Sequence, residues 1–441
     1  MLTPSRQRFD SRMLLLLGML AFLALGCVFY RAYISHANDF RAVYYPTRCL
    51  LANRDPYSRA AVNQVYVEQG GESRDPIAAD NRNNQIASQN PYPPTIFPII
   101  APIALLSWKY AKLAFYLADI GAFLVACMLV WDVAAGISAE AAGFLFFLLL
   151  INSESLIVYG NVAGLVIGLS AIAVWCFLRN RLVPLGVVCL GLALALKPHE
   201  SGQVWLCLML LGGAYRRRAL QSLLVLAAVG LPAVVWVSHL SPHWLFEMRA
   251  NIASYSQHGG INDPGPGSGG AHGIDMLVSL QTTFSVLKDN PLFYNAATYL
   301  VCAPLIAIWG YLCVRMKPTA RNVWFGLAAI APLSMLPVYH RELDTMLLLL
   351  CIPACAILWK ERTPMGRVAV SVTALGFCLI GFLPWVVVYH FVAEHKIQGE
   401  ARILVGAVPV PLILLSMSLM FLWILWMQRG VEIGLEPMAE P

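Results

Sequence analysis

The sequence predicts an all-α polytopic membrane protein, and two observations support this fold class. Of the 441 residues, 59% are hydrophobic and only 12% are charged, and the mean hydropathy is +0.66, whereas a soluble protein carries roughly 25% charged residues. The hydrophobic residues also fall into long runs, and a transmembrane helix needs about 20 such residues. Together these observations exclude a soluble multidomain enzyme, a disordered chain and a nucleic-acid-binding protein.

Twelve apolar runs are candidates for transmembrane helices. The first run, 13–34, is too long for a signal-peptide core and no small-residue cleavage site follows it, so we expect it to be retained. The others are 109–131, 141–159, 162–178, 182–196, 201–215, 219–238, 292–314, 320–338, 343–359, 368–389 and 403–427. The run 94–108 is also apolar, but it is shorter and contains three prolines.

Basic clusters decide whether 94–108 crosses the membrane, because cytoplasmic loops carry an excess of Lys and Arg. Arg6, Arg8 and Arg12 precede the first run. Later clusters are Arg179 and Arg181; Arg216, Arg217 and Arg218; Arg315, Lys317 and Arg321; Lys360, Arg362 and Arg367; and Arg429. With twelve spans all of them are cytoplasmic, but a crossing at 94–108 would put every later cluster outside. We therefore expect 94–108 to be re-entrant or interfacial, with both termini in the cytoplasm.

This topology divides the chain into a cytoplasmic N-terminus, two membrane modules and an external loop between them. The expected segments are 1–12, 13–238 with its external loop 35–108, the external loop 239–291, 292–427 and the cytoplasmic tail 428–441. The polar residues that could perform chemistry then face outward. Within the second loop, 258–273 is rich in glycine and forms either a flexible linker or a loop that closes over a substrate. It is not a nucleotide phosphate loop, since no Gly-Lys-Ser/Thr follows.

Neither the net charge nor the cysteines indicate a further activity. The net charge of +6 comes from the loop clusters that set the topology. Ten of the eleven cysteines lie in apolar runs and Cys49 alone lies in a polar segment, so we expect no disulfide framework outside the membrane. Cys351 and Cys355 are one helical turn apart, which fits small buried residues better than a metal site.

Asp39 is the first candidate for catalysis, because it lies just beyond the outer end of the first helix. A carboxylate at headgroup depth is partly desolvated, which can adjust its pKa for general-base catalysis. The alternative is an ordinary polar residue beside a helix end.

Lys197 and the segment 339–344 are candidates for binding an anionic substrate. Lys197 interrupts two apolar runs at their outer turn, where it could bind a phosphate or reach the lipid headgroups. Arg341 could bind a phosphate bidentately. His340 and Asp344 are four residues apart and would share a face of a helix. The alternative is a polar cluster at a helix end.

Two carboxylates and several aromatic residues have less specific interpretations. Glu154 and Asp119 lie within apolar runs, where ionisable residues are often functional. A polar contact between helices is expected for Glu154. Tyr44 and Tyr45 belong to an aromatic group that fits a membrane-interface belt, although one or two of its members could stack on a sugar.

Four segments together resemble glycosyltransferase family 87. They are Asp39-Phe40 with Tyr44-Tyr45 and Pro56-Tyr57, then Tyr92-Pro93-Pro94, then Lys197-Pro198, and finally Tyr339-His340 with Asp344. The family includes transferases that take sugar from a polyprenyl phosphate, and it is related to the mycobacterial phosphatidylinositol mannoside mannosyltransferase. One departure is Tyr159-Gly160-Asn161, where the family often has Gly-Gln-x-Asn.

The resemblance implies a GT-C fold and an inverting transferase of the cell membrane with its active site toward the outer face. Asp39 would be the general base, and Lys197, His340, Arg341, Asp344, Tyr44 and Tyr45 would bind the donor phosphate or the substrates. The donor would be a polyprenyl-phosphate-linked hexose or pentose, mannose first, and the acceptor a glycolipid or glycan. No metal or further cofactor is expected, and the sequence contains no Asp-x-Asp.

Two other functions remain open at this stage. A secondary transporter or lipid-linked-sugar flippase would need ionisable residues near mid-membrane, and only Asp119 fits that requirement. A non-catalytic membrane subunit is the third possibility. In each case the partners would include membrane lipids and no nucleic acid.

Overall fold

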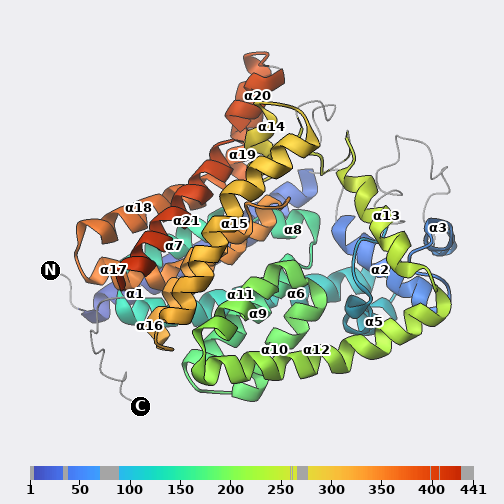
Figure 1. Cartoon of the computed structure of the whole chain (residues 1–441), viewed down its shortest axis with the longest axis horizontal. Coiled ribbons are helices and arrows are strands. Elements are labelled where there is room, and N and C mark those ends of the chain that lie inside the picture. The colour runs from blue at the N-terminus through green and yellow to red at the C-terminus, as the bar shows by residue number, and fades with distance from the viewer. Residues whose placement is uncertain are drawn as a thin grey trace.

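A computed structural model describes residues 4–32, 38–69, 89–258, 260, 262–265, 277–397, 399–406 and 408–428, and these are almost wholly helical (Figure 1). The helices are α1 (Pro4–Ala32), α2 (Asn38–Leu51), α3 (Arg59–Glu68), η1 (Pro94–Ile96), α5 (Phe97–Ala104), α6 (Trp108–Ile137), α7 (Ala139–Ile151), α8 (Ser155–Tyr159), α9 (Ala163–Leu178), α10 (Val183–Leu196), α11 (Pro198–Leu211), α12 (Gly213–Leu240), α13 (Trp244–Ser256), α14 (Leu280–Ser285), α15 (Pro291–Arg315), α16 (Ala320–Ser334), η3 (Glu342–Cys351), α17 (Ile352–Lys360), α18 (Pro364–Leu379), α19 (Phe382–Glu394), α20 (Gly399–Gly406) and α21 (Pro409–Gln428). Within the described ranges the exception to the helical pattern is an isolated β-bridge between Leu277 and Arg341.

Seven helical segments among the described residues are long and apolar enough to cross a membrane. They are Gln7–Ala32, Trp108–Ile137, Ala139–Tyr159, Gly213–Leu240, Pro291–Arg315, Glu342–Lys360 and Pro409–Gln428. Shorter apolar helices accompany them at Pro94–Ala104, Ala163–Leu178, Val183–Leu196 and Pro364–Leu379. The all-helical membrane class is therefore confirmed, while the number of twelve spans remains a prediction.

The segment 94–108 forms η1 and the short helix α5. Together they form one apolar helical stretch, Pro94–Ala104, which is about 17 Å long at 1.5 Å per residue, well below the roughly 30 Å of a bilayer core. It packs against α2, α6 and α12. This geometry fits the expectation that the segment does not cross.

The basic clusters lie together at one end of the molecule. Arg8 and Arg179 both pair with Asp132, at 2.8 Å and 3.3 Å. Arg218 donates a hydrogen bond to Asn180, and Arg321 pairs with Glu361 at 2.6 Å. A Cβ at Gly213 would lie 3.0 Å from Pro318, which joins the cluster at 216–218 to the cluster at 315–321. Since contacting residues lie on the same side of a membrane, the described clusters share one side, as the parity argument expects.

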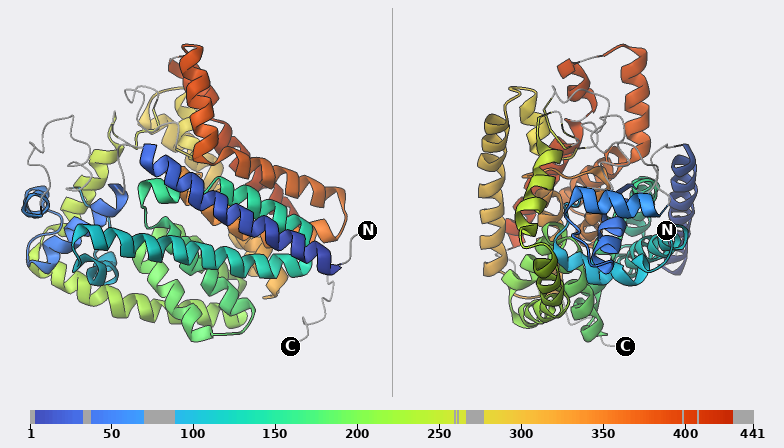
Figure 2. Two further views of the ribbon diagram at one scale, coloured as in Figure 1. Left: turned by 180° about the vertical axis from the view of Figure 1, so that it is seen from behind. Right: turned by 90° about the vertical axis from the view of Figure 1, so that its right-hand side faces the viewer.

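The run 368–389, expected to be one span, is divided into α18 and α19 around Gly381. A Cβ at Gly381 would collide with the side chain of Asn152. The Glu154 carboxylate accepts a hydrogen bond of 2.7 Å from the Leu383 backbone N–H in the first turn of α19, which satisfies a helix-end donor. From this break, α19 and α20 extend beyond the rest of the helices (Figure 2).

A second hydrophobic core holds the first external segment against the membrane helices. It joins α2, α3 and α5 to α6 and to the ends of α9 and α10, and Figure 1 shows α2, α3, α5 and α13 gathered on one side. At its centre the Phe40 and Phe115 rings stack with centroids 4.1 Å apart. This packing places the start of α2, and with it Asp39, beside the start of α9.

Candidate active site

Asp39 lies in the first turn of α2, where it is partly buried. Its Oδ2 accepts a hydrogen bond of 2.7 Å from Nδ2 of Asn161. Oδ1 of Asn161 accepts a bond of 2.9 Å from the Ala163 backbone N–H at the start of α9, so the amide nitrogen must face Asp39. Gly160 makes the preceding turn possible, because its φ of 60° is left-handed.

Burial raises the pKa of Asp39 above its ordinary value, because desolvation disfavours a charged carboxylate. The hydrogen bond from Asn161 and the positive charges of Arg341 and Lys197 lower this pKa, and the Asp344 charge raises it. A carboxylate with a raised pKa is a stronger base than an exposed aspartate. All of these groups act on Asp39, although they come from distant parts of the sequence.

Lys197 occupies the turn between α10 and α11 and is buried, with 7% of the residue exposed. Its Nζ lies 2.5 Å from Oδ1 of Asp344 and 3.2 Å from Oε2 of Glu200. Burial lowers the pKa of Lys197, but the two carboxylates more than offset this and raise it. The shallow turn with access to lipid headgroups, expected as the alternative for Lys197, is therefore wrong, because the side chain is enclosed and paired.

The segment 339–344 brings a second cation and a buried histidine to the same place. Nη2 of Arg341 donates a hydrogen bond of 3.0 Å to Asn262, and the Arg341 backbone N–H donates one of 3.1 Å to Asp344. His340 is 3% exposed, and its ring centroid lies 5.8 Å from that of His199. The expected shared helix face of His340 and Asp344 is not formed, because η3 begins at Glu342.

Described residues within and just after the glycine-rich segment 258–273 reach this site. On one side Asn262 accepts the hydrogen bond from Arg341. On the other, Leu277 forms the β-bridge with Arg341, and the Val278 N–H donates a bond of 3.0 Å to the His340 carbonyl. Most of the segment between them, 266–276, lies outside the described residues, so the choice between a linker and a closing loop stays a prediction.

Tyr44 and Tyr45 are not part of this cluster but belong to the core that anchors α2. They are 0% and 4% exposed. Tyr44 donates a hydrogen bond of 2.8 Å to the Leu106 carbonyl, and Tyr45 stacks on Trp108 with centroids 5.7 Å apart. Their position fits packing rather than the substrate contact predicted for them.

Three polar residues near the site were not singled out from the sequence as candidates for catalysis or binding: Asn161, Glu200 and Glu342. Glu200 follows Lys197 by three residues on one helix face, which is a usable signal for an ion pair. Asn161 had only its place in the Tyr-Gly-Asn turn. Glu342 stood beside Arg341, but its deep burial, at 5% exposure, depends on tertiary packing.

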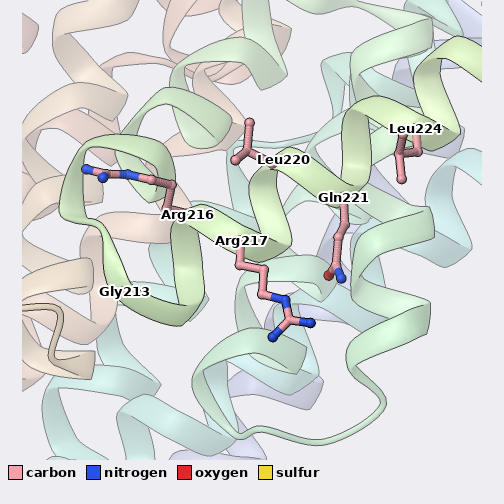
Figure 3. A pocket seen from close by; sticks show the side chains of 6 residues that line it. All are labelled: Gly213, Arg216, Arg217, Leu220, Gln221 and Leu224. Carbon is pink, nitrogen blue, oxygen red and sulfur yellow. The ribbon is translucent and has the colours of Figure 1, made fainter.

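Elsewhere in the described part of the chain we find neither a metal site nor a second cluster of this kind. No group of three or more His, Cys, Asp or Glu in that part could hold a metal ion. A shallow groove follows one face of α12, where it is lined by Gly213, Arg216, Arg217, Leu220, Gln221 and Leu224 (Figure 3). It contains none of the candidate catalytic or binding residues, so the cluster around Asp39 remains the candidate site.

Comparison with known proteins gives one family match. The model of glycosyltransferase family 87 matches residues 90–263. That range contains Tyr92, Asn161, Lys197 and Asn262 from the site and its neighbourhood. No curated protein and no solved structure matches the chain.

Proposed function

Since the model of glycosyltransferase family 87 matches residues 90–263, we propose that the chain is a member of this family and that it transfers mannose from a polyprenyl-phosphate donor to a glycolipid or glycan at the outer membrane face. Membership implies a membrane glycosyltransferase. The identity of the donor, the sugar, the acceptor and the side of the membrane are parts of the proposal.

One observation supports it: a carboxylate, an amide and two cations from four distant segments act on one another in a single site. The Asp39 carboxylate, which accepts the Asn161 amide, is influenced by the charges of both Arg341 and Lys197. A transferase that uses a lipid-phosphate donor needs a base for the acceptor hydroxyl and positive charge for the departing phosphate. This cluster offers both.

In the proposed reaction, Asp39 takes the proton of an acceptor hydroxyl through Oδ1, since Asn161 occupies Oδ2. The hydroxyl oxygen attacks the anomeric carbon from the side opposite the phosphate. The bond from that carbon to the phosphate oxygen breaks and its electron pair leaves with the polyprenyl phosphate. The configuration is inverted, and the proton remains on Asp39 until it returns to solvent.

Arg341 and Lys197 have different tasks in this mechanism. The planar guanidinium of Arg341 suits bidentate binding of the phosphate oxygens. Lys197 is already paired with Asp344 and Glu200, so it supplies a fixed positive charge near the leaving group and holds the carboxylates around it.

The transporter alternative depended on Asp119, a carboxylate in the middle of α6. Its Oδ1 accepts a hydrogen bond of 2.6 Å from the Leu165 backbone N–H in the first turn of α9. A negative charge at a helix N-terminus is a common stabilising arrangement. This contact supports a structural role for Asp119 and weakens the case for an ion pathway.

The test is reconstitution of the purified protein in liposomes with a radiolabelled polyprenyl-phosphate mannose and a lipid extract as acceptor. We expect transfer by the wild type. Asp39→Asn keeps the shape and the Asn161 contact but removes the basicity, and loss of a general base costs about 10²–10⁴-fold in rate.

The control is Asp132→Asn, which changes a carboxylate at the cluster of basic residues and should leave the transfer rate unchanged. Uptake of donor without bond cleavage would contradict the proposal in favour of a transporter or flippase. An Asp39→Asn variant that retains more than about a tenth of the wild-type rate would exclude Asp39 as the base.

A further inference from the structure

Glu342 is a buried carboxylate without a partner for either oxygen. The residue is 5% exposed, and neither Oε1 nor Oε2 has a hydrogen-bond partner among the described residues. The charge of Arg341 acts on this carboxyl group, but no side chain in the described part of the chain forms a salt bridge with it.

The other buried carboxylates in the described residues all have partners. Asp119 and Glu154 accept backbone N–H groups of α9 and α19. Glu200 and Asp344 pair with Lys197, and Asp263 pairs with His258 at 3.1 Å. The oxygens of Glu200 accept no hydrogen bond either, but Glu200 has its ion pair with Lys197. Glu342 has neither kind of partner, and the charges of Asp344 and Asp39 act on it, which places it in the candidate active site.

An unpartnered buried carboxylate is unfavourable for folding, because it loses its hydration and gains nothing in return. Such a group is explained when a ligand supplies the missing donors. Two oxygens on one carbon, both acceptors, match two hydroxyl groups on neighbouring carbons, which can donate one hydrogen bond to each oxygen. Neighbouring hydroxyls of this kind are the characteristic recognition feature of a sugar ring.

We propose that Glu342 binds two neighbouring hydroxyl groups of the donor sugar and so selects the sugar that is transferred. The inference rests on the proposed function, because it takes Arg341, the preceding residue, as the ligand of the donor phosphate. A sugar attached to that phosphate lies within reach of the next side chain in the sequence. Glu342 and Asp39 then approach the same ring, one at its hydroxyls and the other at the incoming acceptor.

The competing explanation is that Glu342 serves only as a counter-charge for Arg341. The two explanations predict opposite effects of an apolar replacement on stability. If Glu342 balances Arg341, Glu342→Met removes the counter-charge of a half-buried cation and lowers the unfolding temperature. If Glu342 waits for a ligand, the same change removes an unsatisfied charge and raises the unfolding temperature of the ligand-free protein.

The first measurement is thermal unfolding of the ligand-free protein, followed by tryptophan fluorescence. We expect Glu342→Met to unfold at a higher temperature than the wild type. The matched control is Glu154→Met, which removes a buried carboxylate that does accept a hydrogen bond and should therefore unfold at a lower temperature. A fall for Glu342→Met comparable with the control overturns the inference.

The second measurement is binding of short-chain polyprenyl-phosphate mannose and its single deoxy analogues to the protein in nanodiscs. In the wild type, removal of either of two neighbouring hydroxyls should weaken binding by about 10- to 100-fold, the range for hydrogen bonds to a charged group. Glu342→Met loses both hydrogen bonds, so it should bind the complete donor at least as weakly as the wild type binds a single deoxy analogue, and it should not distinguish the analogues from the complete donor.

The outcomes separate this inference from the proposed function. The losses of binding free energy caused by Glu342→Met and by removal of a hydroxyl can be compared in a double-mutant cycle. If the two losses add, Glu342 does not bind that hydroxyl, even when the wild type transfers sugar. Binding with the expected non-additive pattern, but without transfer, supports Glu342 as the sugar ligand and contradicts the proposed reaction. A wild type that binds no polyprenyl-phosphate mannose overturns both.

Discussion

The pKa of Asp39 is subject to two opposing effects, and each can be assigned to particular features of the structure. Burial raises the pKa of its carboxyl group, and the Asn161 amide is the first of the groups that lower it. Because the net shift is upward, the ionised form of Asp39 is favoured less in the folded protein than in solution. The protonated Asp39 carboxyl group therefore favours the folded state. This contribution to the free energy of unfolding is fully present at low pH and is lost as the pH rises through the raised pKa. Neutral pH therefore favours catalysis by Asp39 at some expense of stability.

Activity should accordingly fall at acidic pH, above the range in which an ordinary aspartate titrates, because the base must be deprotonated to act. Asn161→Ala removes a hydrogen bond of 2.7 Å to the carboxylate, which should raise the pKa further and move the acidic limb of the pH–rate profile to higher pH. The measurement is the profile of transfer rate for the wild type and the variant. The control is Asn322→Ala, which removes an amide that hydrogen-bonds to the Lys317 carbonyl instead of to the base. An unmoved limb in Asn161→Ala would mean that the amide does not act on the base.

Lys197→Ala should lower stability strongly, which corrects the view of Lys197 as a side chain near the surface. The variant leaves Asp344 and Glu200 buried without their shared cation, and removal of one partner from a buried pair costs about 3–5 kcal/mol. Adding Asp344→Asn to this variant should restore part of the loss, so the two changes are non-additive. Chemical or thermal unfolding of the two single variants and the double variant measures this, and additive effects would show that the pair is not coupled.

Much of the candidate site could be predicted from individual residues, but their partners could not. Asp39, Lys197 and Arg341 stood out because charged residues beside apolar runs are uncommon, and each is in the cluster. The sequence could not reveal that Asn161 orients Asp39, since these residues are 122 positions apart. Nor could it separate Tyr44 and Tyr45 from substrate-stacking residues, because an aromatic side chain suits a hydrophobic core equally well.

The start of α9 is the element on which the site depends, and α6 fixes it in place. Gly164 and Gly168 lie one turn apart on α9 and face α6, where a Cβ at Gly168 would be 2.6 Å from the backbone carbon of Ala122. Small residues at this spacing let membrane helices approach closely. The Asp119 carboxylate then reaches the first turn of α9, on the same helix end that carries Asn161.

Gly168→Ala should therefore destabilise the protein, because the added methyl group meets backbone atoms that cannot move independently. Overpacking of this kind typically costs about 1–3 kcal/mol. The matched control is Gly121→Ala on α6, where a Cβ would meet nothing within 4 Å. This substitution should stabilise the helix by up to about 1 kcal/mol. Unfolding temperatures of both variants in one detergent measure the difference, and equal effects would contradict the close packing of α6 and α9.

At the level of elements, apolar periodicity predicted where helices lie better than where they break. The ends of α9 and α10 agree with the predicted runs, since polar residues and glycine mark them. The break at Gly381 was missed because it is caused by Asn152 and Glu154, which approach from another helix. The 3₁₀ helix η3 has ten residues, and all but Glu342 lie in the predicted run 343–359. Such a length is uncommon, and the segment begins beside the candidate site.

Over the whole molecule, composition was sufficient to predict the membrane class but not the number of crossings. Helices α10 and α11 have 14 residues each, or about 21 Å at 1.5 Å per residue, which is shorter than a bilayer core. Each of these two helices is hydrophobic enough to be predicted as a transmembrane span, but each is too short to cross a bilayer core. The position of the basic clusters at one end of the molecule is more informative. It requires an even number of membrane crossings between any two clusters, whatever the total number of spans.

Cysteine labelling tests that parity and assigns the membrane side. Gln7→Cys and Arg179→Cys lie at the end where Arg8 and Arg179 share Asp132, so both should react only after permeabilisation of cells, in a background with the exposed Cys27 and Cys378 replaced. Lys288→Cys, in the predicted external loop, should react with an impermeant thiol reagent in intact cells. Labelling of Arg179→Cys from outside while Gln7→Cys stays protected would mean that 94–108 crosses the membrane and that the two ends cannot meet as they do here. Labelling of both from outside would leave the fold intact but reverse its orientation, and the site around Asp39 would then face the cytoplasm.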